Sequence, residues 1–412
     1  MNDQLEELET FTLDNGLKVY YLHLPKSNAV YADFTFHSGS QDDPQSKAGL
    51  AHFVEHMINA ASAMPSPKII NHFKNQGGDC ELGSTGISST NYNFQCLAAE
   101  KNLAEALSIF GRLLLDNPMN KGLNKEKKVV IQEFQRAFPD PERIGLLRQL
   151  GLLFRNGQLE PTDISGLGEP ASINSFNYKD IIYFYRQHYS PSNLSLIVFG
   201  NLNADLTLTL IKQSPFGRQP SLAINRMPQL NLSYPAIEPT KIDYRYTTAS
   251  LGYTRKIILD SSFPDRAKSI TYLLIRSKLF DRLRIKERLC YSIISCWDRV
   301  ARGNCYFSIG SSDLHLDAED KIAGLVDDCL QEIMANETEY ERTKRNFWLG
   351  QTLNDPSPNG LLKTLRGELI NKTSTHKLKD WIAYQQAGTF AEVQQVIEKF
   401  QSSYAEIYSK PK

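Results

Sequence analysis

His52 and His56 stand four residues apart in the stretch 49–57, with Glu55 between them. If this stretch is helical, the spacing places both imidazoles on one face, one turn apart, with Glu55 beside them. Two imidazoles so placed can supply two ligands of a tetrahedral zinc ion, and a carboxylate next to them can take a proton from water that the metal activates. The residues therefore predict a metal centre with Glu55 as general base.

The order H-x-x-E-H is the reverse of the commoner H-E-x-x-H and is typical of inverted zinc peptidases. A catalytic zinc site needs a third protein ligand. The predicted helix 124–138 carries Glu126 and Glu133, seven residues apart and two turns along one face. A surface helix rich in lysine could carry the same glutamates, and an ordinary amphipathic helix could carry the two histidines. The residues alone leave these alternatives open.

The elements expected to position these residues follow the same plan in both halves of the chain. In the first half, strands are expected in a hairpin over 10–24 and over 31–37 and 194–199, and helices over 98–115 and 124–138. In the second half, strands are expected over 244–253, 256–259, 289–297 and 304–310, and helices over 265–286, 317–335, 339–353, 360–369 and 390–408.

Five prolines between residues 214 and 240 predict a linker between the two halves. Strands and helices that are segregated within each half favour an antiparallel sheet with one helical layer. We therefore expect an α+β fold with two structurally repeated domains, an N-terminal metal-binding domain at 1–213 and a C-terminal repeat at 241–412.

Composition narrows the class of partner. The chain has 412 residues and 46 basic against 46 acidic ones, and this balance argues against nucleic acid or an anionic membrane. The six cysteines have no C-x-x-C spacing, so no thiolate metal site is expected. The polar, acidic residues 1–9 do not resemble a signal peptide, and the apolar run 194–199 is too short to span a bilayer. We expect a cytoplasmic protein.

The chain resembles the pitrilysin/insulinase family of zinc metallopeptidases, in particular its half-length bacterial members and the mitochondrial processing peptidase beta subunit. The resemblance rests on Leu13-Asp14-Asn15-Gly16-Leu17, on His52-Phe53-Val54-Glu55-His56-Met57, on Glu126 and Glu133, and on Leu167-Gly168-Glu169. It implies that His52, His56 and Glu133 bind Zn²⁺, that Glu55 is the catalytic base, and that Glu126 supports a ligand from outside the metal's coordination sphere.

The same resemblance gives a role to Arg284 and Tyr291 in the second half. In the family, an arginine near a helix end and a tyrosine seven residues later reach the substrate carbonyl at the zinc. A planar cation and a phenol can stabilise the oxyanion that forms there. Without the family, Arg284 would be read as a solvated helix charge and Tyr291 as a strand residue.

One stretch departs from the family pattern. Where relatives usually have Asn-Ala-x-Thr in an edge strand that pairs with the substrate backbone, this chain has Glu81-Leu82-Gly83-Ser84. Strand addition needs a free edge rather than particular side chains, so peptide binding is expected to survive. The departure affects which substrate side chains are preferred next to the scissile bond. Glu81 is a candidate to favour basic substrate residues there.

The function implied is a zinc-dependent endopeptidase that hydrolyses peptides or small unfolded proteins inside a dimeric chamber. Since one chain carries both the metal ligands and the Arg284–Tyr291 pair, a homodimer is the simplest expectation, and a heteromer with a paralogous subunit is the variant. The alternative function is a non-catalytic structural or partner-binding subunit of the same fold. Histidine and carboxylate ligands also accept cobalt or manganese.

Overall fold

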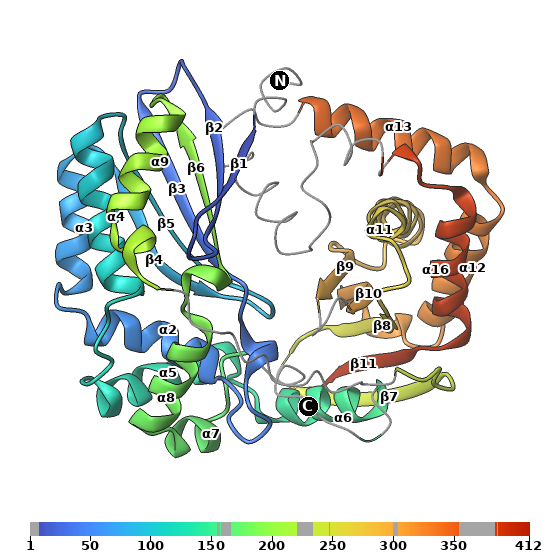
Figure 1. Cartoon of the computed structure of the whole chain (residues 1–412). Coiled ribbons are helices and arrows are strands. Elements are labelled where there is room, and N and C mark those ends of the chain that lie inside the picture. The colour runs from blue at the N-terminus through green and yellow to red at the C-terminus, as the bar shows by residue number, and fades with distance from the viewer. Residues whose placement is uncertain are drawn as a thin grey trace. The chain divides into compact units, whose positions relative to one another are not determined.

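The computed structural model describes residues 8–154, 157, 166–220, 234–246, 248–299, 304–353, 384 and 386–412. These residues form two compact units, each built from one sheet and a set of helices (Figure 1). The α+β class with two sheet-and-helix units is confirmed. No described helix is long and apolar enough to cross a membrane.

The first unit holds strands β1 to β6 and the helix that carries the two histidines. Its strands are β1 (Glu9–Thr12), β2 (Lys18–His23), β3 (Ala29–Phe36), β4 (Asp79–Thr85), β5 (Thr90–Leu97) and β6 (Leu194–Gly200). Its helices are α2 (Leu50–Ala61), α3 (Ser66–Asn75), α4 (Glu100–Leu114), α5 (Leu123–Ala137), α7 (Pro170–Ser175), α8 (Tyr178–His188), α9 (Ala204–Gln213) and α10 (Pro215–Arg218).

The strand order of this sheet is β1-β2-β6-β3-β5-β4. The expected hairpin is present, since β1 pairs antiparallel with β2. The sheet is not purely antiparallel as expected: β6 enters between β2 and β3 after a long helical excursion and runs parallel to β2. A chain that returns to the sheet in this way must make such a crossover connection. Strand β4 is left at one edge, paired with β5.

Alternation along β3 explains how the sheet binds its helical layer. Val30, Ala32, Phe34 and Phe36 are buried on one face, as the period of two in a strand requires. Phe34 stacks on Phe110 of α4 and on Phe216 of α10, with ring centroids 5.4 and 4.7 Å apart. The helices therefore lie on one defined face of the sheet, and α2 is packed within this layer.

The second unit is built on the sheet order β7-β11-β8-β10-β9. Its strands are β7 (Thr240–Tyr246), β8 (Leu251–Leu259), β9 (Ile294–Arg299), β10 (Cys305–Leu314) and β11 (Ala405–Pro411). Its helices are α6 (Pro141–Phe154), α11 (Asp265–Leu279), α12 (Ile322–Met334), α13 (Glu337–Leu353) and α16 (Phe390–Ser402), and a π-helical segment, Phe280–Lys286, follows α11. One pair is again parallel, β7 with β11.

The compact units are interleaved along the chain. Helix α6 belongs to the second unit, although its residues fall within the predicted segment 1–213. Leu150 and Phe154 of α6 share a buried cluster with Ile242 of β7 and Ile407 of β11. The predicted helix over 360–369 lies outside the described residues, as do residues 221–233 of the predicted linker 214–240. Within that linker, Pro215–Arg218 forms helix α10.

A buried charge network stabilises the second sheet. The guanidinium of Arg255 in β8 is fully buried and donates to Glu406 Oε1 at 2.7 Å and to Asp327 Oδ1 at 2.5 Å. Tyr253 donates its hydroxyl to the same Glu406 oxygen at 2.6 Å, and Arg255 lies 4.2 Å from the ring centroid of Tyr404. This one cation therefore links β8 to β11 and α12.

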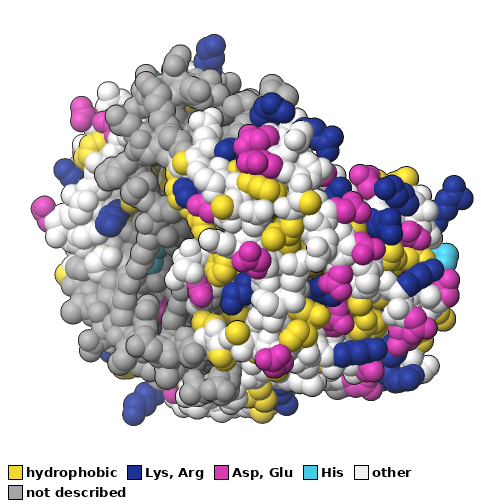
Figure 2. Space-filling model, turned by 90° about the vertical axis from the view of Figure 1, so that its right-hand side faces the viewer, with side chains coloured by type: hydrophobic (Ala, Val, Ile, Leu, Met, Phe, Trp, Pro, Cys, Tyr) yellow, Lys and Arg dark blue, Asp and Glu magenta, His cyan; other side chains and the backbone are white. Residues whose placement is uncertain are grey.

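The described surface agrees with the balanced charge of the sequence. On the face drawn in Figure 2, the lysines and arginines of the described residues are interspersed with aspartates and glutamates, and no large coloured region carries one sign of charge.

Candidate active site

Helix α2 presents His52 and His56, and its first turn is fixed by Asp43. The buried Asp43 carboxylate accepts hydrogen bonds from the backbone N–H of Gly49 at 2.6 Å and of Ala51 at 2.7 Å. It therefore satisfies donors that a helix start leaves unpaired. Gly49 has a left-handed φ of 88° and packs directly against Gly168, where any side chain would collide. No role for Asp43 could be predicted from local patterns, because this aspartate lies six residues before its first hydrogen-bond partner, Gly49.

The structure brings together His52, His56 and Glu133 of α5. Glu133 Oε2 lies 3.3 Å from His56 Nε2 and 3.8 Å from His52 Nε2. The two imidazole rings are 4.7 Å apart and inclined by 76°, and one ligand atom from each of the three residues lies within 4.8 Å of the other two. Donor atoms on a tetrahedral zinc ion lie roughly 3.3 Å apart, so the spacing fits one metal ion.

The electrostatics of the site favour metal binding over an ordinary ion pair. Burial and the neighbouring His56 lower the pKa of His52 to about 4, so its imidazole is neutral near pH 7. The neutral ring is the form that ligates a metal. Among the described residues, this is the one group of three or more His, Cys, Asp or Glu side chains that could hold an ion.

Glu126 lies behind the ligands. Its Oε2 is 3.4 Å from Nδ1 of His56, the ring nitrogen on the side away from Glu133. A carboxylate in this place accepts the Nδ1 proton and leaves Nε2 free to bind the metal. The sequence pattern alone could not distinguish Glu133 from Glu126. In the structure, Glu133 lies near Nε2 of both histidines, whereas Glu126 lies near Nδ1 of His56.

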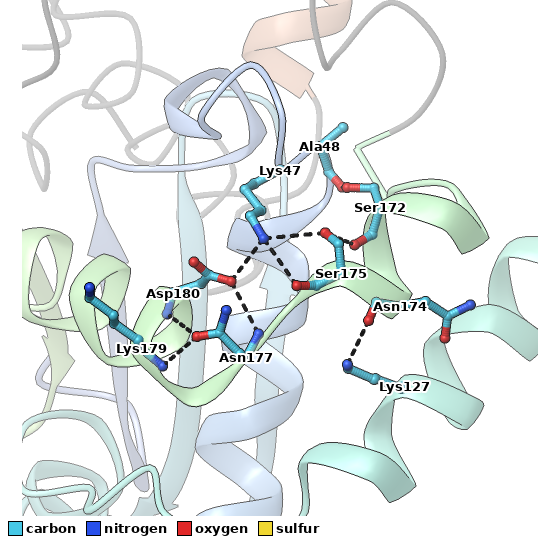
Figure 3. A network of polar contacts seen from close by, with 9 residues as sticks. All are labelled: Lys47, Ala48, Lys127, Ser172, Asn174, Ser175, Asn177, Lys179 and Asp180. Atoms are coloured by element: carbon cyan, nitrogen blue, oxygen red, sulfur yellow. Dashed lines mark hydrogen bonds and ion pairs between the residues drawn. The ribbon is translucent and has the colours of Figure 1, made fainter.

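The segment 172–180, which runs from α7 into the first turn of α8, ties the start of α2 to α5 (Figure 3). Lys47, just before α2, donates to the Ser175 carbonyl and forms an ion pair with Asp180, both at 3.0 Å. Lys127 of α5 donates to the Asn174 carbonyl at 2.8 Å. Ser172 donates its hydroxyl to the Ala48 carbonyl at 2.8 Å. These bonds hold the two ligand-bearing helices to one short segment.

Glu55 points from α2 toward the edge strand β4. Its side chain is buried, and Thr85 of β4 donates its hydroxyl to Oε2 at 3.2 Å. Burial raises the pKa of Glu55 to about 7; Glu133 and Glu81 add to the rise, while His56 and the Thr85 hydrogen bond oppose it. A base with a pKa near the working pH is suited to both accepting and returning a proton.

A β-bulge brings β4 onto Glu55. The pairing of β4 with β5 shifts register between Glu81 and Ser84. Asn59 of α2 fixes the bulge by donating its side-chain amide to the Leu82 carbonyl at 2.8 Å. Gly83 has a φ of 147°, and a Cβ on this residue would overlap the Glu55 carboxylate. The sequence signal for this contact was the glycine itself, in a strand that otherwise has side chains to pack.

Gly83→Ala is therefore expected to displace Glu55 and to lower kcat/KM for peptide hydrolysis by at least about tenfold, since small misplacements of a catalytic group cost this much or more. Zinc content should be unchanged, because Glu55 is not among the three donors. Gly77→Ala is the matched control: Gly77 also has a left-handed φ, 71°, but its added Cβ would meet no atom within 4 Å. Equal losses in the two variants would contradict the contact.

Arg284 and Tyr291 lie in the second unit and contact each other. The guanidinium of Arg284 is 4.1 Å from the ring centroid of Tyr291 and 5.0 Å from that of Phe280. Tyr291 is 74% exposed. Tyr291 precedes β9, which begins only at Ile294, so the expected strand start at 289 is wrong; Arg288, with φ 54°, turns the chain between the π-helical segment and the strand. The predicted pair is thus preassembled by cation–π stacking.

Comparison with known proteins places this geometry in a family. The insulinase family model (peptidase family M16) matches residues 18–159, and the model of the peptidase M16 inactive domain matches residues 175–347. A probable zinc protease, PqqL of Escherichia coli, is 28% identical over 247 residues, which are 58% of this chain and 25% of that protein. An uncharacterized zinc protease of Rickettsia bellii is 25% identical over 358 residues, 82% of this chain and 81% of that protein.

Solved structures agree on the fold. A protease from Helicobacter pylori superposes with a TM-score of 0.80 at 19% identity, covering 98% of this chain and 99% of that one. The periplasmic protease PqqL from Escherichia coli superposes with a TM-score of 0.76 at 20% identity, covering 98% of this chain but 48% of that one. This chain thus spans about half the length of PqqL. With both family models matched in order along the sequence and the ligand cluster in place, the chain belongs to the insulinase family of peptidases, family M16.

Proposed function

We propose that this chain is a zinc-dependent endopeptidase. The observation that carries the proposal is the convergence of His52, His56 and Glu133 on one point, with the buried carboxylate of Glu55 beside them. A zinc ion held by these three residues would supply Lewis acidity, polarising the substrate carbonyl and lowering the pKa of water. A metal-storage protein would need no Glu55.

The residues of the chain divide the reaction between them. Glu55, ionised, accepts a proton from the attacking water on its carboxylate and then donates it to the nitrogen of the leaving amine as the C–N bond breaks. Thr85 holds that carboxylate by its 3.2 Å hydrogen bond. Glu126 keeps the Nδ1 proton of His56 in place, so the ring presents Nε2 to the metal.

Strand β4 is the proposed platform for the substrate. Among the described strands it pairs with β5 alone, so its outer edge can accept an extended peptide by main-chain hydrogen bonds. Its bulge lies against Glu55, and a peptide added to this edge would therefore pass the catalytic base. Peptides and small unfolded proteins are the substrates that can present an extended backbone. The cytoplasmic location expected from the sequence remains a prediction.

The proposed assembly is a homodimer in which Arg284 and Tyr291 of one copy serve the metal site of the other, with a paralogous subunit as the variant. Mixing inactive Glu55→Gln with inactive Arg284→Ala protein should then restore about a quarter of wild-type activity, since half of the random dimers hold one intact composite site. The measurement is peptide cleavage after subunit exchange, which is verified with differently tagged copies. No recovery despite verified exchange would exclude shared sites.

The activity itself is tested with a pool of short quenched fluorescent peptides, incubated with the purified protein with and without a chelator. Chelator-sensitive cleavage that zinc restores is the expected result. Intact peptides in the presence of protein with bound zinc would overturn the proposal and favour a non-catalytic subunit of the same fold.

A further inference from the structure

Glu81 is an exposed carboxylate on the proposed peptide-binding strand, next to the catalytic base. It is the last residue of β4 before the bulge that touches Glu55. Its position is fixed by Asn93, directly opposite in β5, whose side-chain amide donates to Glu81 Oε2 at 2.5 Å. A neutral donor orients this carboxylate but leaves its charge in place.

The charged groups around Glu81 do not neutralise it. Among the described residues, no lysine or arginine forms an ion pair with Glu81. Asp79, two residues earlier on the same face of the strand, is also acidic, and Glu55 lies beyond the bulge. Burial and Asp79 raise the pKa of the Cys80 thiol and the nearby Lys74 opposes this rise, but the side chain of Cys80 points to the face of β4 opposite to that of Glu81. The edge beside Glu55 is therefore negative where a substrate strand would lie.

We propose that Glu81 makes the enzyme select peptides with lysine or arginine next to the scissile bond. The inference rests on the proposed endopeptidase function and names its substrate class. In a peptide added to β4, alternate side chains share the face of Glu81, and directly opposed side chains on neighbouring strands have Cβ atoms roughly 5 Å apart. Glu81 would attract a cationic side chain at that position and repel an acidic one, and both effects increase the preference for lysine or arginine.

The test uses one cleavable peptide in which lysine, glutamine or glutamate is placed in turn at each of the three positions on either side of the scissile bond. At one position, kcat/KM for lysine should exceed that for glutamine by about fivefold, the upper range for a partly exposed ion pair, and glutamate should be poorer than glutamine. The lysine preference should weaken as salt is added.

Variants of Glu81 test the assignment through this ratio, which cancels general changes in activity. Glu81→Gln can keep the Asn93 hydrogen bond but should bring the lysine-to-glutamine ratio of kcat/KM toward one. Glu81→Lys should reverse the preference, so that the glutamate peptide is cleaved faster than the glutamine peptide and the lysine peptide more slowly. Asp79→Asn, which removes a carboxylate from the same face of the same strand but two residues farther from the bulge, is the matched comparison and should lower the ratio by less than Glu81→Gln does.

Two failures can be told apart. Cleavage of the glutamine peptides with a lysine-to-glutamine ratio near one at every position overturns the role of Glu81 and leaves the peptidase intact. A lysine preference that survives in Glu81→Lys also overturns it. Absence of cleavage of every peptide in the set overturns the endopeptidase proposal and this inference with it.

Discussion

Glu55→Gln is expected to lower kcat for peptide hydrolysis by at least about 10³-fold while zinc binding is retained. Removal of a positioned general acid–base group costs typically 10² to 10⁴-fold. Glutamine has the same shape as glutamate and can still accept the Thr85 hydrogen bond through its amide oxygen, but it cannot take up a proton. The metal should stay, because the donors that converge are those of His52, His56 and Glu133.

The measurement is single-turnover cleavage together with zinc content by mass spectrometry on the same preparation. Glu100→Gln, an exposed glutamate at the start of α4, serves as control and should match the wild type. Activity of the Glu55→Gln protein above a tenth of the wild-type value would show that another group transfers the proton. Loss of zinc in this variant would place Glu55 among the ligands instead.

The largest expected effect on stability comes from Arg255→Met, which should lower the free energy of unfolding by about 3–5 kcal/mol, the range for breaking a buried ion pair. The fully buried guanidinium is the cation that neutralises Glu406, itself 14% exposed in its side chain. Methionine fills much of the space of the arginine side chain but leaves the carboxylates of Glu406 and Asp327 without their cationic partner. The loss at Asp327 costs less, because half of its side chain is exposed and can be solvated.

Urea unfolding followed by tryptophan fluorescence can measure this effect. All three tryptophans, Trp297, Trp348 and Trp381, lie in the second half of the sequence, and Trp297 packs against the core of the second unit. Arg245→Met in β7 is the control, since Arg245 is exposed and its described contact is one 3.3 Å hydrogen bond to the Pro411 carbonyl. It should change stability by less than about 0.5 kcal/mol. Equal changes in the two variants would contradict the role of the Arg255 network.

The parts of the site that follow helical periodicity could be predicted from the sequence. The four-residue spacing of His52 and His56 was enough to place them on one face of α2, and the structure has this arrangement. The choice between Glu126 and Glu133 could not be made from spacing, because both lie on the same face of α5. It depends on how α5 packs against α2, which no local pattern encodes.

The parts that depend on contacts between distant segments were missed for the same reason. Asp43 binds the first turn of α2 from a loop, and Gly83 reaches Glu55 through a bulge whose position is fixed by Asn59. In the sheets, the antiparallel hairpin was predicted from its turn residues, but the parallel entry of β6 beside β2 depends on a return after many residues. Helix α6 likewise belongs to the second unit because Leu150 and Phe154 pack in a buried cluster there.

The most direct test of the metal-dependent mechanism is a titration of the metal-free protein with zinc while the initial rate of peptide cleavage is followed. Among the described residues, His52, His56 and Glu133 offer one set of three donors that could hold an ion, so the rate should rise linearly from zero and level off at one zinc per chain. Cleavage by the metal-free protein, or full occupancy of the site by zinc without cleavage, would contradict the account.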